Sequence, residues 1–327
     1  MLVTLVAISL VLVYPHLLRR GGITLKIFYA GSLTLALKDA TKAYEALSHG
    51  VSIITEGSGS VQAVRKITDL GKNCDIIMVA DYKLIRKYLI PKYADWCLAF
   101  CSNKIVLCYT NNSRYSDMIN GDNWYKVLLM PGVKVGFSNP TLDPCGYRAL
   151  SILYLSSLAY NCSEIWDELV KRHLGNLKVK ANSTGHYIYL PRELSYIPGG
   201  KLVLRSKSVD LIGLLEGGML DYAFEYKSVA REHGLRYVEL PSGLNLAEDP
   251  PVKVFIVLRQ EEGGEKVIRI EGIKYGVTVL KDSRNFKEAV KFLRWLLRGQ
   301  GKRILADHGF KLVALEPMGN VPAELRG

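Results

Sequence analysis

Asp143 is a carboxylate in a position where it could contact a ligand. It follows a predicted strand over residues 133–138 and the turn-forming pair Asn139-Pro140, and it precedes a predicted helix over residues 147–160. In an open α/β sheet, ligands bind at the carboxyl ends of the strands, so Asp143 is placed to touch one. An aspartate directly before a helix is also a common N-cap or turn residue, and the local sequence alone favours that second interpretation.

Two serines near the N-terminus have surroundings that suit an anion. Ser32 follows Gly31 at the first crossing from strand to helix, and Ser60 ends the glycine- and serine-rich run 57–60 at the second crossing. Small residues let backbone N–H groups approach a ligand, the hydroxyls can donate, and a helix N-terminus adds partial positive charge. The alternative is that both serines are only N-caps. The strands and helices concerned are expected at residues 23–30, 33–47, 51–55 and 61–70.

Composition disfavours several other kinds of site. The net charge of +12 is the excess of 43 Lys and Arg over 31 Asp and Glu, and the basic residues are scattered along the 327 residues. A positive field that attracts small anions therefore explains the charge as well as a nucleic-acid partner does. The six cysteines form no C-x-x-C pair and the six histidines show no metal-ligand spacing. No Walker lysine motif or G-x-S-x-G elbow is found, and no helix-turn-helix that a transcriptional effector would need. We therefore expect no enzyme, no cofactor and no nucleic-acid partner.

The first residues differ in kind from the rest. Residues 2–18 are almost wholly apolar, interrupted by Pro15-His16, and are short for a bilayer span. Residues 1–22 are therefore predicted to be a signal peptide or a membrane anchor, although Arg19-Arg20 follow the apolar run instead of preceding it. This places the remaining chain outside the cytoplasm, at the cell surface.

Strand and helix patterns alternate after residue 23, which predicts an α/β fold with doubly wound, mostly parallel sheets. The length exceeds one ordinary core, so two lobes are expected, with a ligand between them as in a hinged clamp. Lobe one is predicted to comprise residues 23–107 plus 236–327, and lobe two residues 108–235. Residues 186–205, with two prolines and a Gly-Gly pair, are expected to form an excursion or hairpin.

Seven short motifs follow one another in a fixed order from about residue 25 to the end. They are Gly31-Ser32-Leu33, residues 56–60 with Arg65-Lys66, Ala80-Asp81-Tyr82, residues 91–96, residues 136–140 with residues 143–148, residues 215–218, and residues 221–228. This ordered set resembles the archaeal tungstate/molybdate-binding proteins of ABC importers. The resemblance implies a type II periplasmic-binding-protein fold with the oxyanion in an interlobe cleft, and a monomer that delivers the oxyanion to a membrane permease.

The resemblance also implies a set of ligand-binding residues. Ser32 and Ser60 match hydroxyl donors, Tyr226 matches a tyrosine that helps hold the oxyanion, and Asp143 and Glu216 match two carboxylates that approach the tungsten or molybdenum atom itself. Glu225 is the alternative to Glu216, because the segment 186–205 disturbs the alignment before it.

Carboxylates beside a dianion raise a physical question. They would repel any dianion at low effective dielectric, but a hard oxygen donor bonded to an electron-poor hexavalent metal compensates for that repulsion. Sulfate or phosphate offers nothing comparable. A generic tetrahedral-oxyanion binder is the second interpretation, and an enzyme on the same fold is the third.

Overall fold

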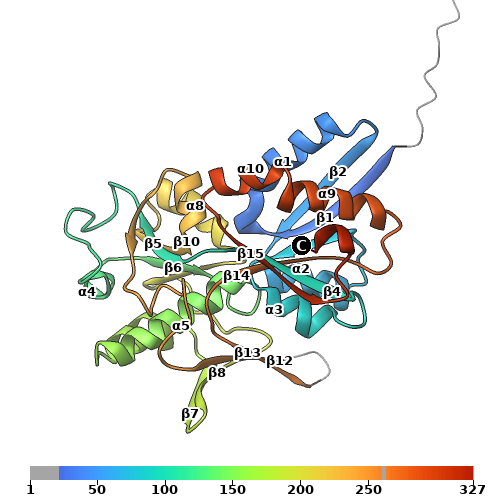
Figure 1. Ribbon diagram of the computed structural model, residues 1–327. Helices are drawn as coiled ribbons and strands as arrows, with labels where there is room; N and C mark the ends of the chain where they lie inside the picture. Colours follow the sequence, from blue (N-terminus) through green and yellow to red (C-terminus); the bar gives the residue numbers. More distant parts are fainter. Residues whose placement is uncertain (1–21, 260–262, 327) are drawn as a thin grey trace, which may run out of the picture.

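Figure 1 shows the computed structural model, which describes residues 22–259 and 263–326. The predicted leader over residues 1–22 lies outside these residues apart from Gly22. Three sheets organise the chain, with strand orders β15-β4-β14-β3-β1-β2, β11-β5-β10-β6-β9 and β13-β12-β8-β7. Within the described residues, no helix is long and apolar enough to cross a membrane.

The first sheet is mixed. β1 pairs in parallel with β2 and β3, whereas β14 runs antiparallel to β3 and β4, and β15 antiparallel to β4. The prediction of a mostly parallel sheet is therefore wrong for this part of the α/β fold. The physical reason is that the chain leaves the sheet through β4 and returns through β14. The strands are β1 (Ile23–Ala30), β2 (Val51–Ser58), β3 (Ile76–Val79), β4 (Trp96–Ser102), β14 (Lys274–Val279) and β15 (Lys311–Gly319).

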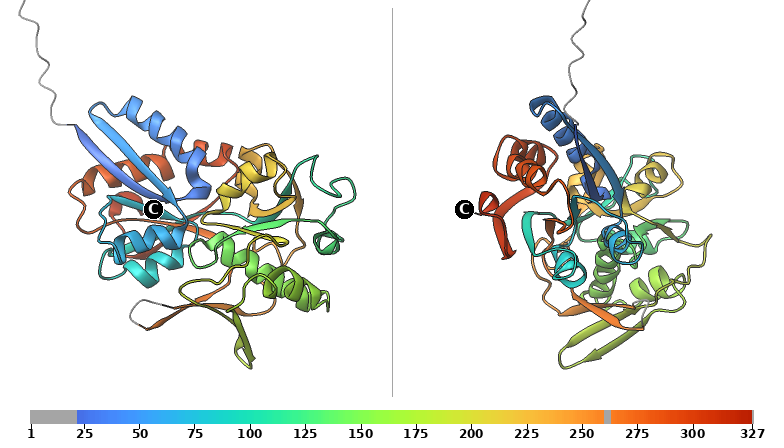
Figure 2. Two further views of the ribbon diagram at one scale, coloured as in Figure 1. Left: turned by 180° about the vertical axis from the view of Figure 1, so that it is seen from behind. Right: turned by 90° about the vertical axis from the view of Figure 1, so that its right-hand side faces the viewer.

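Helices cover both faces of the first sheet (Figures 1 and 2). All four side chains of β3 are fully buried, as expected for a central strand covered on both sides. The predicted apolar face of the helix over 286–297 is packed against the core through Val290, Leu293 and Leu297. The elements are η1 (Gly31–Leu33), α1 (Thr34–Leu47), α2 (Ser60–Thr68), α3 (Tyr82–Leu84), η2 (Ile85–Leu89), α9 (Phe286–Arg298), α10 (Gly301–Asp307) and η5 (Ala323–Leu325).

The second sheet is mixed as well, with β6 parallel to β9 and β10, and β5 antiparallel to β10 and β11. β5 and β11 lie wholly in this sheet, so the predicted lobe boundaries at 107/108 and 235/236 fall a few residues from the crossings between the sheets. Its strands are β5 (Ile105–Tyr109), β6 (Val135–Ser138), β9 (Leu202–Arg205), β10 (Tyr222–Tyr226) and β11 (Arg236–Glu239). Its helices are α4 (Trp124–Leu129), α5 (Pro144–Ala159), α6 (Glu164–Trp166), η3 (Asp167–Lys171), η4 (Ser208–Leu211), α7 (Ile212–Glu216) and α8 (Lys227–Glu232).

The third sheet joins two excursions of the chain. β7 (Lys178–Asn182) and β8 (Gly185–Leu190) leave from the second sheet, and β12 (Val254–Arg259) and β13 (Glu265–Arg269) follow it. The two hairpins meet through parallel pairing of β8 with β12, and they project from one side of the molecule (Figure 2). The predicted excursion over 186–205 thus contains most of β8 and all of β9.

Candidate functional site

The carboxyl ends of strands from the first two sheets meet at one place, which we term the junction. Ser32 follows β1 and Ser60 follows β2, while Asp143 follows β6 and Tyr226 ends β10. Each of these four side chains is at least nine-tenths buried. The structure therefore brings together four of the five residues expected to bind a ligand.

The two sides of the junction are in direct contact. The N–H of Gln62 donates to the carbonyl of Leu142 at 3.1 Å. A Cβ atom on Gly59 would lie 2.5 Å from that same carbonyl oxygen, so a larger residue would force the loops apart. Gly57 has a different role, because its Cβ would lie 2.8 Å from the Tyr29 ring inside the first sheet. Of the two glycines in the predicted cradle, Gly59 is the one that lets the sheets meet.

Neither serine acts as a side-chain cap. Ser60 is the first residue of α2, and its Oγ accepts a hydrogen bond from the N–H of Ala80 at 3.0 Å. Ser32 lies inside η1, with its Oγ 2.8 Å from the hydroxyl of Tyr275 in β14. The N-cap interpretation of both serines is therefore wrong, since these hydroxyls bond to neighbouring strands and strand ends.

Asp143 does occupy the N-cap position of α5, but its side chain makes no cap hydrogen bond. Its Oδ2 instead accepts from the N–H of Ser208 at 3.1 Å, which links α5 to the start of η4. Burial raises the pKa of Asp143 to about 6, against the opposing effects of the Ser208 N–H and the charge of Arg148. The carboxylate is thus held inside the junction, where it contacts the start of η4.

The structure does not bring Glu216 to the junction. Glu216 is exposed at the end of α7, whereas the segment that ends there begins at the junction with Ser208. Eight residues of helical rise carry the chain about 12 Å or more along that segment. Sequence alignment alone could not supply this distance.

The alternative acid, Glu225, is fully buried in β10, next to Tyr226. Its Oε2 accepts from the N–H of Tyr226 at 2.7 Å, and among the described residues its Oε1 has no hydrogen-bond partner. Burial raises the pKa of Glu225 to about 8, and the nearby charge of Asp143 acts in the same direction. Two acids with different pKa values therefore lie close to each other in the second sheet.

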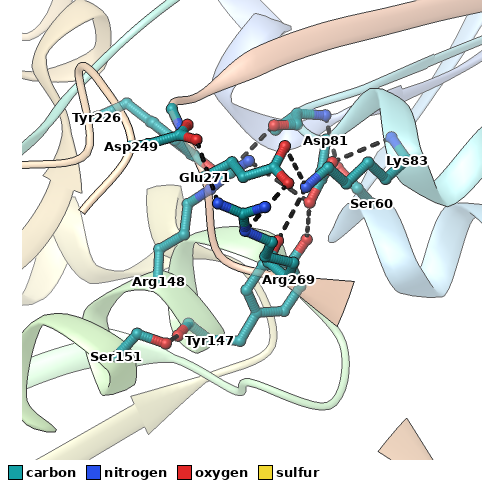
Figure 3. A network of polar contacts seen from close by, with 12 residues as sticks. Ser60, Asp81, Lys83, Tyr147, Arg148, Ser151, Tyr226, Asp249, Arg269 and Glu271 are labelled. Atoms are coloured by element: carbon teal, nitrogen blue, oxygen red, sulfur yellow. Dashed lines mark hydrogen bonds and ion pairs between the residues drawn. The ribbon is translucent and has the colours of Figure 1, made fainter. Parts of the chain in front are cut away.

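Arg148 is the residue that sequence reasoning missed, although it stands in the motif around Asp143. Its Nη1 donates to the carbonyl of Ala80 at 2.7 Å and to the hydroxyl of Tyr226 at 2.8 Å, so it spans both sheets (Figure 3). The side chain is 4% exposed. The available signal is that Arg148 is the only charged residue in the sequence of α5.

Asp81 and Tyr147 complete this network. The Tyr147 hydroxyl donates to Asp81 Oδ2 at 2.6 Å, and Arg148 Nη2 lies 3.6 Å from the same oxygen. Toward the third sheet, Lys83 pairs with Glu271 at 2.6 Å, as Figure 3 shows. The cavity between these groups has a volume of about 10 Å³, enough for a single water, so the junction is closed here.

No metal cluster appears in residues 22–259 and 263–326, since no three His, Cys, Asp or Glu side chains gather there in a way that could hold an ion. The junction instead combines hydroxyls, the cation Arg148 and three buried acids, of which Asp81 is paired with Arg148. This set suits an oxyanion, whose oxygens accept hydrogen bonds from the hydroxyls.

Comparisons with known proteins agree with this chemistry. Residues 25–311 match the model of the bacterial extracellular solute-binding proteins. The chain is 42% identical over 307 residues to an uncharacterized solute-binding protein of Staphylothermus marinus, with 92% of this chain and 87% of that protein covered. It is 41% identical over 313 residues to a molybdate/tungstate-binding protein of Pyrococcus abyssi, with 92% and 88% covered.

Two solved structures share the fold. The periplasmic molybdate-binding protein of Azotobacter vinelandii has a TM-score of 0.60 at 14% identity, covering 89% of this chain and 100% of that chain. The sulfate-binding protein SubI of Mycobacterium tuberculosis has a TM-score of 0.60 at 16% identity, covering 89% and 87%. The resemblance to archaeal tungstate/molybdate-binding proteins and the periplasmic-binding-protein fold are confirmed, and the chain belongs to the bacterial extracellular solute-binding protein family.

Proposed function

We propose that this protein captures tungstate or molybdate at the junction, outside the cytoplasm, and delivers it to an ABC permease without performing a reaction. The observation that carries the proposal is the convergence of buried groups from both sheets, with Ser32 and Ser60 on one side and Asp143 and Tyr226 on the other. The 41% identity to a protein named for molybdate and tungstate supports it.

We assign the two carboxylates to Asp143 and Glu225, in place of Asp143 and Glu216. Because burial raises the pKa of Glu225 to about 8, this acid is mostly protonated at neutral pH and can donate a hydrogen bond. Asp143, with a pKa of about 6, is then mostly ionised and is the group that approaches the metal. This division keeps one negative charge, not two, beside a dianion.

A sulfate or phosphate binder remains the second candidate, because the sulfate-binding structure matches the fold as well as the molybdate-binding one does. The buried carboxylate favours the metal oxyanions. Bound sulfate and phosphate remain four-coordinate and do not take up a carboxylate oxygen as an extra ligand. Asp143 would therefore repel sulfate, which has no proton to donate to it at neutral pH.

Calorimetry tests the proposal directly. Protein beginning at Gly22 is titrated with tungstate, molybdate, sulfate and phosphate at neutral pH. We expect the first two to bind at least about 100-fold more tightly than the last two, a difference of about 2.7 kcal/mol. Equal affinity for all four anions would replace the proposal with a generic oxyanion binder.

The remaining assignments concern the setting of the protein. We assign residues 1–22 to a leader or membrane anchor that takes no part in the junction, and the protein to a monomer. Full-length protein and protein beginning at Gly22 should therefore bind tungstate equally well. A loss of binding in the shorter, folded protein would show that the leader contributes to the site.

A further inference from the structure

Arg148 has no role in the family resemblance described above, but its contacts point to one. We propose that Arg148 is a positioning residue, which leaves the hydroxyl protons of Tyr226 and Ser60 free for the oxyanion and holds the two sheets in the closed arrangement. This inference rests on the proposed function of the junction and adds a determinant of its specificity.

The first step concerns the hydroxyl of Tyr226. A guanidinium can only donate hydrogen bonds, so at 2.8 Å from Arg148 Nη1 the Tyr226 oxygen must be the acceptor. The Tyr226 proton is left for another group, and no described residue accepts it. The side chain is 1% exposed, and burial raises the pKa of Tyr226, so the proton is retained and cannot turn to water. An oxygen of a bound anion satisfies it.

The second step applies the same reasoning to Ser60 on the other side. Arg148 Nη1 donates to the carbonyl of Ala80, and the N–H of the same residue donates to Ser60 Oγ. Ser60 Oγ is therefore also an acceptor toward the protein, and its proton has no acceptor among the described residues. Arg148 Nη1 thus contacts Tyr226 directly, and it is linked to Ser60 through Ala80.

The third step concerns charge. The nearest carboxylate oxygen to Arg148, on Asp81, is 3.6 Å from Nη2 and already accepts a hydrogen bond from Tyr147 at 2.6 Å. This ion pair is long and its carboxylate oxygen is shared with Tyr147, so an anion beside Tyr226 would add a further favourable charge next to the buried guanidinium. Arg148 therefore favours a fully ionised ligand over a neutral one of the same shape.

A double-mutant cycle tests whether Arg148 acts through Tyr226. Tungstate dissociation constants are measured for wild type, Arg148→Lys, Tyr226→Phe and the double variant. We expect each single change to weaken binding about tenfold or more. Lysine is shorter than arginine and lacks its rigid planar fork, so it does not hold both acceptors in place, and Tyr226→Phe removes the hydroxyl itself. The double variant should be within about threefold of the weaker single variant.

The matched control pairs Arg148→Lys with Ser32→Ala. Ser32 bonds to Tyr275 and makes no contact with Arg148, so those two losses should multiply. Losses that also multiply for Arg148 and Tyr226 would show that Arg148 acts on stability alone and would overturn the inference. Absence of oxyanion binding by the wild type would instead refute the proposed function.

A second variant covers the case in which Arg148→Lys does not fold. Asp81→Asn keeps the acceptor for the N–H of Lys83, but an amide nitrogen replaces the oxygen that faces Arg148 Nη2 and the Tyr147 hydroxyl. Donors then face donors, and the guanidinium is displaced from Tyr226. We expect Asp81→Asn to weaken tungstate binding less in the Tyr226→Phe background than in wild type. An equal loss in both backgrounds would contradict the role assigned to Arg148.

Discussion

Two regions of the molecule connect the first and second sheets through ionisable side chains. They differ in whether their buried polar atoms all have hydrogen-bond partners. In one, His308 after α10 contacts Glu232 of α8 through Nδ1 at 2.7 Å and Asp39 of α1 through Nε2 at 3.0 Å. α1, α8 and α10 lie beside one another in Figure 1. In the other, the junction, buried polar atoms lack partners.

Among the described residues, three buried side-chain atoms without a hydrogen-bond partner lie at or next to the carboxyl ends of β10, β2 and β6, namely Glu225 Oε1, Ser58 Oγ and Ser138 Oγ. Trp96 Nε1, Ser156 Oγ and Trp295 Nε1 also lack a partner but lie in other parts of the molecule. Shifted pKa values do not separate the two regions, because burial raises the pKa of Glu232 to about 7 against the effect of His308 and raises the pKa of Glu225 to about 8. What separates them is that both ring nitrogens of His308 are used. A perturbed pKa alone therefore does not distinguish the junction from the His308 cluster, whereas the unpartnered Glu225 Oε1 does.

The largest expected effect comes from Asp143→Asn. If its oxygen bonds the metal, the weaker amide donor should reduce tungstate affinity about 100-fold, while sulfate binding stays level or improves because a negative charge is gone. Calorimetry with tungstate and sulfate measures whether the two affinities change in opposite directions. Glu216→Gln is the matched control on an exposed acid and should change neither affinity. Equal gains for both anions would make Asp143 a purely structural acid.

A smaller effect is expected from Gly59→Ala, which tests the contact between the sheets. The added Cβ meets the Leu142 carbonyl, so closure is opposed and tungstate should bind about tenfold more weakly. Small-angle scattering should show that tungstate reduces the radius of gyration of the wild type and reduces it less in the variant. Gly213→Ala has open space around its Cβ and provides the control. An unchanged radius in wild type at saturation would contradict a clamp.

The third prediction concerns pH and Glu225. As pH rises through about 8, Glu225 loses its proton and a second negative charge faces the dianion, so wild-type tungstate affinity should fall about fivefold or more. Below about pH 6, protonation of Asp143 removes the metal donor and affinity should fall again. Glu225→Gln should abolish only the alkaline decline. A decline that persists in this variant would exclude Glu225 as its source.

The smallest effect on tungstate binding is expected from a change in the cluster of His308, Glu232 and Asp39. His308→Ala leaves the Glu232 carboxylate, 4% exposed, without its partner and should lower the free energy of unfolding by about 1–3 kcal/mol. Tungstate affinity should remain within about twofold of wild type. Thermal unfolding and calorimetry on the same samples separate the two readouts. A variant with normal stability but weakened binding would reverse the distinction between the two regions.

The sequence predicted the strand-to-helix crossings of the junction better than it predicted which second acid lies there. Strand-to-helix crossings with serine or aspartate identified Ser32, Ser60 and Asp143, because such crossings place side chains at one sheet edge. Glu216 lies exposed at the end of α7, a position that motif matching could not give because it carries no information on where the far end of a helix points. Arg148 was overlooked because its partners are a backbone carbonyl and a tyrosine far away in sequence.

The sheets show the same division between local and distant information. β1, α1 and α2 follow from local periodicity, and their bounds agree with prediction to within a few residues. The antiparallel place of β14 between β3 and β4, and the pairing of β8 with β12, join segments that local patterns cannot relate. Local patterns therefore could not predict that the sheets are mixed, or at which residues the chain crosses between the first and second sheets.

The place of β14 in the first sheet also constrains how the protein is made. β3 and β4 cannot be joined until Lys274–Val279 has been synthesised, and the outer edge of β4 stays open until Lys311–Gly319 arrives. Until both of these late strands have been made, β3 and β4 carry open edges, and such edges are templates for pairing with other chains.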